Sequence, residues 1–155
     1  MMMPLTCNVL EKLSGKTLCT AESCTGGGIG AALTGVPGSS EVYKGGIISY
    51  TNEVKHRVLG VPAEYLDNLG AVSGPVAQAM AEGARRVLQA DVAVSVTGLA
   101  GPDGDEYGHP VGTVFIGYAD AETAFAREYH FEGDREQVRE QTIRAALELV
   151  LNINR

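Results

Sequence analysis

The apolar residues of the chain follow two periods, one typical of helices and one of strands. Helical spacing predicts an opening helix over 4–13, with Gly15 just beyond its end. Asp134, followed three residues later by Gln137, predicts a capped C-terminal helix. The other helices are predicted over 25–33, over a turn or two at 53–59, from Pro62 onward, and over 73–89 with Ser73 as its N-cap.

Runs of β-branched and apolar residues predict five strands, at 17–21, 46–50, 91–97, 112–118 and 123–131. The last two are joined by only four residues, so they pair antiparallel, whereas the earlier strands alternate with helices. This order predicts an α/β fold, a three-layer α/β/α sandwich around a mixed sheet. The whole chain, 1–155, is expected to form a single domain.

Composition and charge narrow the functional classes. The net charge of −7 without a basic cluster argues against nucleic-acid binding. No apolar run approaches the roughly 20 residues of a membrane helix, and the N-terminus lacks a secretory signal, so we expect no membrane association and a cytoplasmic location. Three cysteines without a CxxC pair argue against a disulfide framework or structural zinc, and the acidic run at 103–106 lacks calcium-loop spacing. No metal is therefore predicted.

Three polar or glycine-rich segments follow predicted strands, at 22–28, 50–55 and 97–110. In open α/β sheets, ligands bind outside the carboxyl ends of the strands, so these segments should border one pocket. They bring hydroxyls and candidate bases, together with backbone N–H donors at Thr97, Gly98 and the glycines at 26 and 27.

The segment 17–30 predicts a strand, a tight turn and the start of a helix, with Ser23, Cys24 and Thr25 on the turn. We expect free N–H groups of the following helix to face a bound anion there. Ser23 is one candidate nucleophile and Cys24 the other, because thiols at helix N-termini can be activated. A turn that only cradles phosphate is the alternative, and a buried, inert cysteine is the commoner case.

A serine nucleophile needs a base, and the sequence offers histidine or lysine. Tyr50 and Lys55 are further candidate bases. His56, His109 and His130 have no obvious carboxylate to orient them, so Lys55, with a pKa lowered by partial burial or by a neighbouring cation, is the better candidate. Taken singly, Tyr50 and Lys55 are more often surface or packing residues. Arg135 and Arg139, one turn apart, would ordinarily be a solvated pair.

Seven short segments stand out in order along the chain. They are A-E-S-C-T-G-G at 21–27, S-Y-T-N-E-V-K at 49–55, L-G-V at 59–61, G-A-V-S at 70–73, T-G-L-A-G-P-D-G at 97–104, P-V-G-T-V at 110–114 and G-D-R at 133–135. Together they resemble the CinA C-terminal domain family. The resemblance implies hydrolysis of nicotinamide mononucleotide to nicotinic acid mononucleotide and ammonia, without metal or organic cofactor. The larger N-terminal domain of full-length CinA proteins is absent here, so a stand-alone form is expected.

The resemblance also implies roles for individual residues. Ser23 matches the nucleophile of the family motif, and Lys55 and Tyr50 match the residues that activate it and manage its proton. The cysteine of the motif is not assigned the attack. The expected substrate-binding residues, which surround this group along the pocket, are Thr25, Gly26, Gly27, Asn52, Thr97, Gly98 and Arg135.

Two departures from the family pattern are Gly74, where many members have glutamate, and His109, where a lysine is common. They leave the identity of the substrate open. A catalytically silent nucleotide-binding module, and an amidase acting on another small amide, remain alternatives. The expected partner is a small nucleotide substrate, and a homo-oligomer is expected.

Overall fold

A five-stranded sheet with the order β2-β1-β3-β4-β5 organises the computed structural model, which describes residues 2–155. β1 lies parallel to β2 and β3, while β4 pairs antiparallel with β3 and β5. The predicted mixed sheet and the antiparallel hairpin are confirmed. The strand bounds are β1 Leu18–Glu22, β2 Tyr43–Ile48, β3 Val92–Gly98, β4 Thr113–Ala119 and β5 Ala124–His130.

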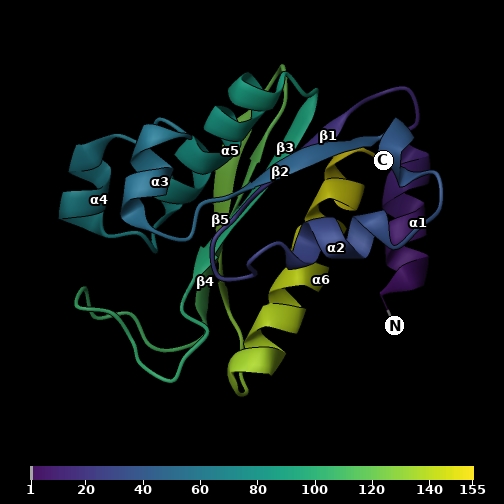
Figure 1. Ribbon diagram of the computed structural model, residues 1–155. Helices are drawn as coiled ribbons and strands as arrows, with labels where there is room; N and C mark the ends of the chain where they lie inside the picture. Colours follow the sequence, from purple (N-terminus) through teal and green to yellow (C-terminus); the bar gives the residue numbers. More distant parts are fainter. Residues whose placement is uncertain (1) are drawn as a thin grey trace.

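Helices cover both faces of this sheet (Figure 1), which confirms the predicted three-layer sandwich. α1, α2 and α6 pack over one face and share a core with Leu18, Val94 and Val96. α4 and α5 pack over the other face against Cys19, Ala21 and Ala93. The helix bounds are α1 Met3–Lys12, α2 Gly28–Thr34, α3 Asn52–Arg57, α4 Ala63–Leu69, α5 Gly74–Leu88 and α6 Arg135–Ile153, with a 3₁₀ turn at Ser39–Glu41.

The two cores follow from the period of two along each strand, because successive side chains point to opposite faces. In β3, Val92, Val94 and Val96 face α6, whereas Ala93 faces α5. The small residue leaves room for α5 to lie close to the sheet. Both faces are therefore filled, as the nearly unbroken apolar run of β3 predicts.

Helix ends agree with the predictions in part. The capping box of α6 is present, with Asp134 accepting from the Gln137 N–H and the Gln137 side chain accepting from the Asp134 N–H. Ser73 does occupy the N-cap of α5, but its hydroxyl donates to the Gly70 carbonyl instead of capping the helix.

The helix after Ser23 begins later than predicted, at Gly28 and not at residue 25. Gly26 and Gly27 have φ values of +59° and +102°, in the left-handed region, so residues 23–27 form turns before the helix starts. This delay moves the N-terminus of α2 away from Ser23.

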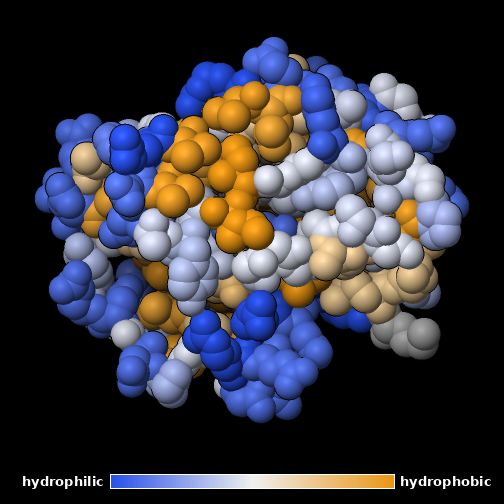
Figure 2. Space-filling model, in the orientation of Figure 1, coloured by the Kyte–Doolittle hydropathy of each residue, from blue (hydrophilic) through white to orange (hydrophobic). Residues whose placement is uncertain are grey.

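β2 is an edge strand, and its last residue, Ile48, is 56% exposed. Figure 2 shows apolar side chains gathered over this part of the molecule, bordered by hydrophilic ones. The expected homo-oligomer stays a prediction. Among residues 2–155, no helix combines the length and the apolar character needed to cross a lipid bilayer.

Candidate active site

The carboxyl ends of β1, β2 and β3 meet at one edge of the sheet and border a cavity of about 290 Å³. The three segments singled out in the sequence all reach it. Its lining residues are Ser23, Cys24, Tyr50, Asn52, Lys55, Ala71, Val72, Thr97, Gly98, Leu99, Ala100, Gly101, Asp103 and Arg135.

Ser23 and Lys55 are hydrogen-bonded at the centre of this lining. Lys55 Nζ lies 3.0 Å from Ser23 Oγ, and it also donates to the Ser49 carbonyl at 2.8 Å. The residue is only 1% exposed, and burial lowers the pKa of its side chain to about 8. A lysine with such a pKa holds a sizeable neutral fraction near pH 7 to 8, which is the form that can accept a proton from a serine hydroxyl.

Local structure holds both residues in place. Ser23 follows β1 directly, and its N–H donates to the Val96 carbonyl at the end of β3. Lys55 lies in α3, which begins after Thr51, whose hydroxyl accepts from the Val54 N–H as an N-cap. Rigid elements therefore position the nucleophile candidate and the base candidate.

The buried carboxylate of Glu22 caps α2. Oε1 accepts from the Ile29 N–H and from the Thr25 hydroxyl, and Oε2 accepts from the Gly30 N–H. The Gly28 N–H donates to the Thr25 carbonyl. The expectation of free helix N–H groups facing a bound anion is therefore wrong, because this carboxylate satisfies them inside the protein.

Cys24 differs from Ser23 in its environment. Its thiol is buried, and burial raises the pKa of the thiol to about 11. A thiol with this pKa stays protonated at neutral pH, and the thiolate is the reactive form. The inert alternative weighed for Cys24 fits this site, and the hydroxyl of Ser23 is the better-placed nucleophile.

Tyr50 lies at the rim and is 58% exposed. Its phenol oxygen accepts from Arg135 Nη2 at 3.1 Å, and Arg135 Nη1 donates to the Gly101 carbonyl at 2.6 Å. Tyr50 reaches Lys55 only through its backbone carbonyl, at 3.4 Å from Nζ. The structure thus links the Tyr50 phenol to Arg135 and not to the Ser23 and Lys55 pair.

The predicted substrate-binding residues divide into two groups. Asn52, Thr97, Gly98 and Arg135 line the cavity, with the Thr97 hydroxyl donating to the Ala71 carbonyl. Thr25 is fully buried with its hydroxyl on Glu22, and neither Gly26 nor Gly27 lines the cavity. The glycines shape the turn instead of touching the space beside Ser23.

Sequence reasoning missed two residues near the site. The Asp103 carboxylate belongs to the cavity lining, within the long loop that was expected there. Arg139 donates from α6 to the carbonyls of Cys24 and Thr25, so it is not a solvated residue. The only sequence signal for Arg139 was its spacing of one helical turn from Arg135.

The histidines prove to be outside the site for a different reason from the one expected. His109 Nδ1 lies 2.7 Å from Asp105 Oδ2, and His130 lies 2.7 Å from Glu128, so two of them do have carboxylate partners. None of the three lines the cavity. Gly74, the other departure from the family pattern, does not line it either. Within the described part of the chain, no three His, Cys, Asp or Glu side chains gather as metal ligands.

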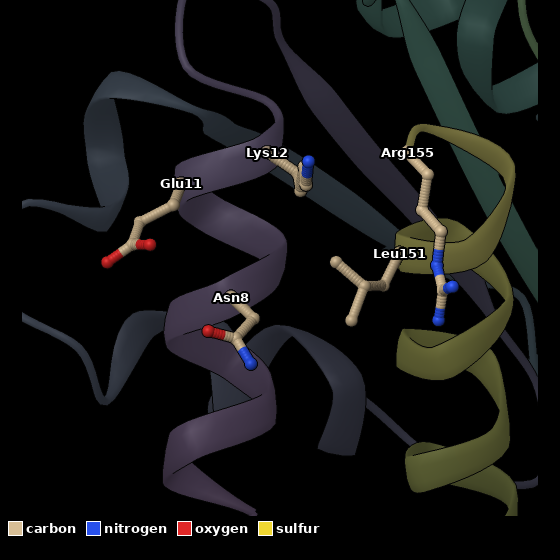
Figure 3. A pocket seen from close by; sticks show the side chains of 5 residues that line it. All are labelled: Asn8, Glu11, Lys12, Leu151 and Arg155. Carbon is tan, nitrogen blue, oxygen red and sulfur yellow. The ribbon is translucent and has the colours of Figure 1, made fainter.

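A second, larger cavity of about 590 Å³ lies between α1 and the end of α6 (Figure 3). Its lining residues are Asn8, Glu11, Lys12, Leu151 and Arg155. None of these is a hydroxyl or thiol nucleophile, and none belongs to the strand ends that carry Ser23. Size alone therefore does not identify the functional site, and the smaller cavity is the candidate.

Comparisons with known proteins identify the family to which the chain is similar. The family model of the CinA C-terminal domain matches residues 4–153. A nicotinamide-nucleotide amidohydrolase, PncC, of Pseudomonas putida is 48% identical over 134 residues, which cover 86% of this chain and 84% of PncC. A CinA-like protein of Geobacter metallireducens is also 48% identical, over 90% of this chain but only 34% of its own length. The chain thus spans about a third of several longer relatives.

Solved structures give the same result for the fold. The crystal structure of a competence-damaged protein (CinA) superfamily protein from Klebsiella pneumoniae has a TM-score of 0.96 and 35% sequence identity. The match covers 99% of this chain and 98% of that one. A competence/damage inducible protein from Agrobacterium tumefaciens has a TM-score of 0.95 and 38% identity, over 99% and 96% of the two chains.

Proposed function

The chain belongs to the CinA C-terminal domain family, and from this premise we propose that it is an amidohydrolase that converts nicotinamide mononucleotide to nicotinic acid mononucleotide and ammonia. The observation that carries the proposal is the 3.0 Å hydrogen bond between buried Lys55 and Ser23, in a cavity at the strand ends. The similarity to PncC, over most of both chains, supports the substrate.

Acylation begins when neutral Lys55 takes the proton of Ser23 as Oγ attacks the carboxamide carbon. The Oγ–C bond forms, and the electron pair of the carbonyl moves onto its oxygen. Near the nucleophile, the Ser23 N–H donates to the Val96 carbonyl and the Gly26 N–H donates to the Ser23 carbonyl. We assign the Cys24 N–H, next to the nucleophile, as the donor to the oxyanion. One such donor typically lowers the activation barrier by about 2.7–4 kcal/mol.

Collapse of this intermediate breaks the C–N bond. Protonated Lys55 gives its proton to the leaving nitrogen, so ammonia departs and an acyl ester on Ser23 remains. Lys55, neutral again, removes a proton from water, which attacks the ester carbon, and Lys55 then returns this proton to Ser23 Oγ as the Oγ–C bond breaks and the carboxylate product leaves. The same pair thus serves both halves of the reaction.

Substrate recognition follows from the charges on the cavity wall. The guanidinium of Arg135 is the cation exposed at the rim, where a nucleotide phosphate would accept from it. Asp103 carries a carboxylate in the same wall, suited to the cationic pyridinium ring or to the ribose hydroxyls. Asn52 and the strand end at Thr97 and Gly98 supply the remaining polar contacts. Tyr50 positions Arg135 through its phenol oxygen.

The non-catalytic binding module is the less favoured alternative. A phosphate cradle needs exposed N–H groups, but the N-terminus of α2 is occupied by Glu22. A binding module also needs no buried lysine beside a serine, and burying a lysine costs free energy because burial disfavours its charged form. An amidase acting on another small amide would use the same chemistry, and only the substrate assay separates the two.

The test is ammonia release from nicotinamide mononucleotide, measured for the wild type, Ser23→Ala and Cys24→Ala. We expect activity in the wild type and in Cys24→Ala, and a loss of at least about 10³-fold in Ser23→Ala. Folded wild type that releases no ammonia, although it binds the nucleotide, would overturn the proposed substrate. Full activity in Ser23→Ala would overturn the nucleophile.

A further inference from the structure

Arg139 binds the backbone of the turn that carries Ser23 and does not line the cavity. Its Nε donates to the Cys24 carbonyl at 3.0 Å, and its Nη2 donates to the Thr25 carbonyl at 3.1 Å. Arg139 is absent from the cavity lining, and it lies 115 positions after Cys24 in the chain. Its two contacts are therefore with the backbone of the turn and not with the cavity.

Arg139 lies in the second turn of α6, which is held firmly in place. The preceding residue, Val138, is fully buried against the sheet, and α6 begins with the capping box at Asp134. A guanidinium presents its N–H groups in a fixed planar fork, so two bonds fix both the distance and the orientation of the turn. Lysine at this place would offer one compact ammonium in place of the fork.

Local hydrogen bonds restrain Thr25, whose hydroxyl donates to Glu22 and whose carbonyl accepts from the Gly28 N–H, so Arg139 adds the link from α6 to Cys24 and Thr25. The Gly26 N–H donates to the Ser23 carbonyl and closes the turn around Cys24 and Thr25. The carbonyls of those two residues are the atoms that Arg139 binds. Because Cys24 also provides the N–H assigned to the oxyanion, a shift of its backbone would misalign that donor and Ser23 Oγ together.

We propose that Arg139 is a positioning residue for the amidase reaction, which aligns Ser23 and the Cys24 N–H by holding the Cys24 and Thr25 carbonyls. This inference rests on the proposed function. It assigns to Arg139 an effect on the chemical step and none on substrate binding, because the side chain does not touch the cavity. A displacement of about 1 Å in such a constellation lowers rates by roughly 10²-fold.

The experiment compares Arg139→Ala and Arg139→Lys with the wild type in ammonia release from nicotinamide mononucleotide. Arg127→Ala is the matched control, since Arg127 lies on edge strand β5 over the Phe125 ring and away from the cavity. We expect kcat to fall about 10- to 100-fold in Arg139→Ala and less in Arg139→Lys, with KM within about twofold of wild type. Millimolar guanidinium chloride should restore part of kcat in Arg139→Ala and none in Arg127→Ala.

A merely structural role predicts another result. Arg139→Ala would then lose thermal stability but keep its kcat at a temperature where it is folded, and guanidinium would not change the rate. Either finding overturns the inference. If Arg139→Ala does not fold, the kcat and KM values of Arg139→Lys decide in the same way.

A fluorophosphonate probe separates this inference from the proposed substrate. Ser23 Oγ displaces fluoride from phosphorus, its proton passes to Lys55, and no amide is needed. Slower labelling of Ser23 in Arg139→Ala than in Arg127→Ala supports the positioning role even if the wild type releases no ammonia from nicotinamide mononucleotide. Equal labelling rates overturn it.

Discussion

Lys55 Nζ donates to the carbonyl of Ser49 and to the hydroxyl of Ser23, so one buried amine joins the ends of β2 and β1. Ser23 and Lys55 lie 32 positions apart, and the chain between them forms α2, the edge strand and the start of α3. Parallel pairing of β1 with β2 brings the two strand ends together. The topology of the sheet, and not proximity in sequence, thus creates the pair.

The rate of the reaction should depend on the protonation of Lys55. Because burial lowers the pKa of this lysine to about 8, we expect kcat/KM to rise tenfold per pH unit below pH 8 and to level off above it. Lys55→Arg should abolish activity, since arginine stays protonated. Lys44→Arg, on the neighbouring strand with its amine on the Gln89 carbonyl, should keep the wild-type profile. A rate independent of pH from 6 to 9 would contradict this role.

Glu22→Gln should destabilise the protein. The carboxylate accepts three hydrogen bonds from Thr25, Ile29 and Gly30 within the core, and a glutamine would place an N–H₂ group against one of these donors. We expect a loss of about 2–4 kcal/mol and a Tm lower by roughly 4–12 °C. Glu136→Gln, at an exposed position in the first turn of α6, is the control and should change little. Equal Tm values for the two variants would contradict the capping role of Glu22.

The fold could be predicted from the sequence because the apolar periods differ between helices and strands. Strand boundaries were right within three residues, and the three segments at the strand ends did form one cavity. The Ser23 and Lys55 pair could be predicted for the same reason, since both follow parallel strands. The local sequence pattern and the strand topology were therefore sufficient to predict this part of the site.

Other parts of the site depend on side-chain to backbone contacts that leave no periodic pattern. The sequence pattern places Glu22 in the turn segment after a strand, yet its carboxylate occupies the helix N-terminus that was expected to face a ligand. Arg139 looked solvated, although it donates to two carbonyls that lie more than 100 residues earlier in the chain. Residue type alone does not reveal such contacts, since any nearby carbonyl or N–H can serve as the partner.

Arg135 should contribute to affinity through the phosphate of the substrate. Arg135→Met removes the charged donor at the cavity rim, so we expect KM for nicotinamide mononucleotide to rise about 10- to 100-fold. Nicotinamide riboside, which has no phosphate, should be hydrolysed by wild type and variant with similar KM values. Steady-state ammonia release with both substrates provides the comparison. An equal rise in KM for the riboside would show that Arg135 does not act through the phosphate.

Stability should rise with pH because of Lys55. Its pKa is about 8 in the folded protein against 10.5 for the ordinary side chain, so between these values the unfolded chain binds more protons. The free energy of unfolding therefore increases across pH 8 to 10.5, by at most about 3 kcal/mol.

Urea unfolding of the wild type and of Lys55→Met at pH 7.5 and 10 measures this effect. Burial raises the pKa of Cys24 to about 11 and that of Cys19 to about 12, and a raised thiol pKa lowers stability as the pH increases above 9, so the wild-type slope alone mixes opposite contributions. Subtracting the Lys55→Met slope removes the thiol contribution, which both proteins share. We expect the difference to favour the wild type more at pH 10 than at pH 7.5, whereas Lys44→Met, with its exposed amine, should follow the wild type. Parallel slopes for wild type and Lys55→Met would show that Lys55 has an ordinary pKa, and the proton transfer from Ser23 would then lack its base.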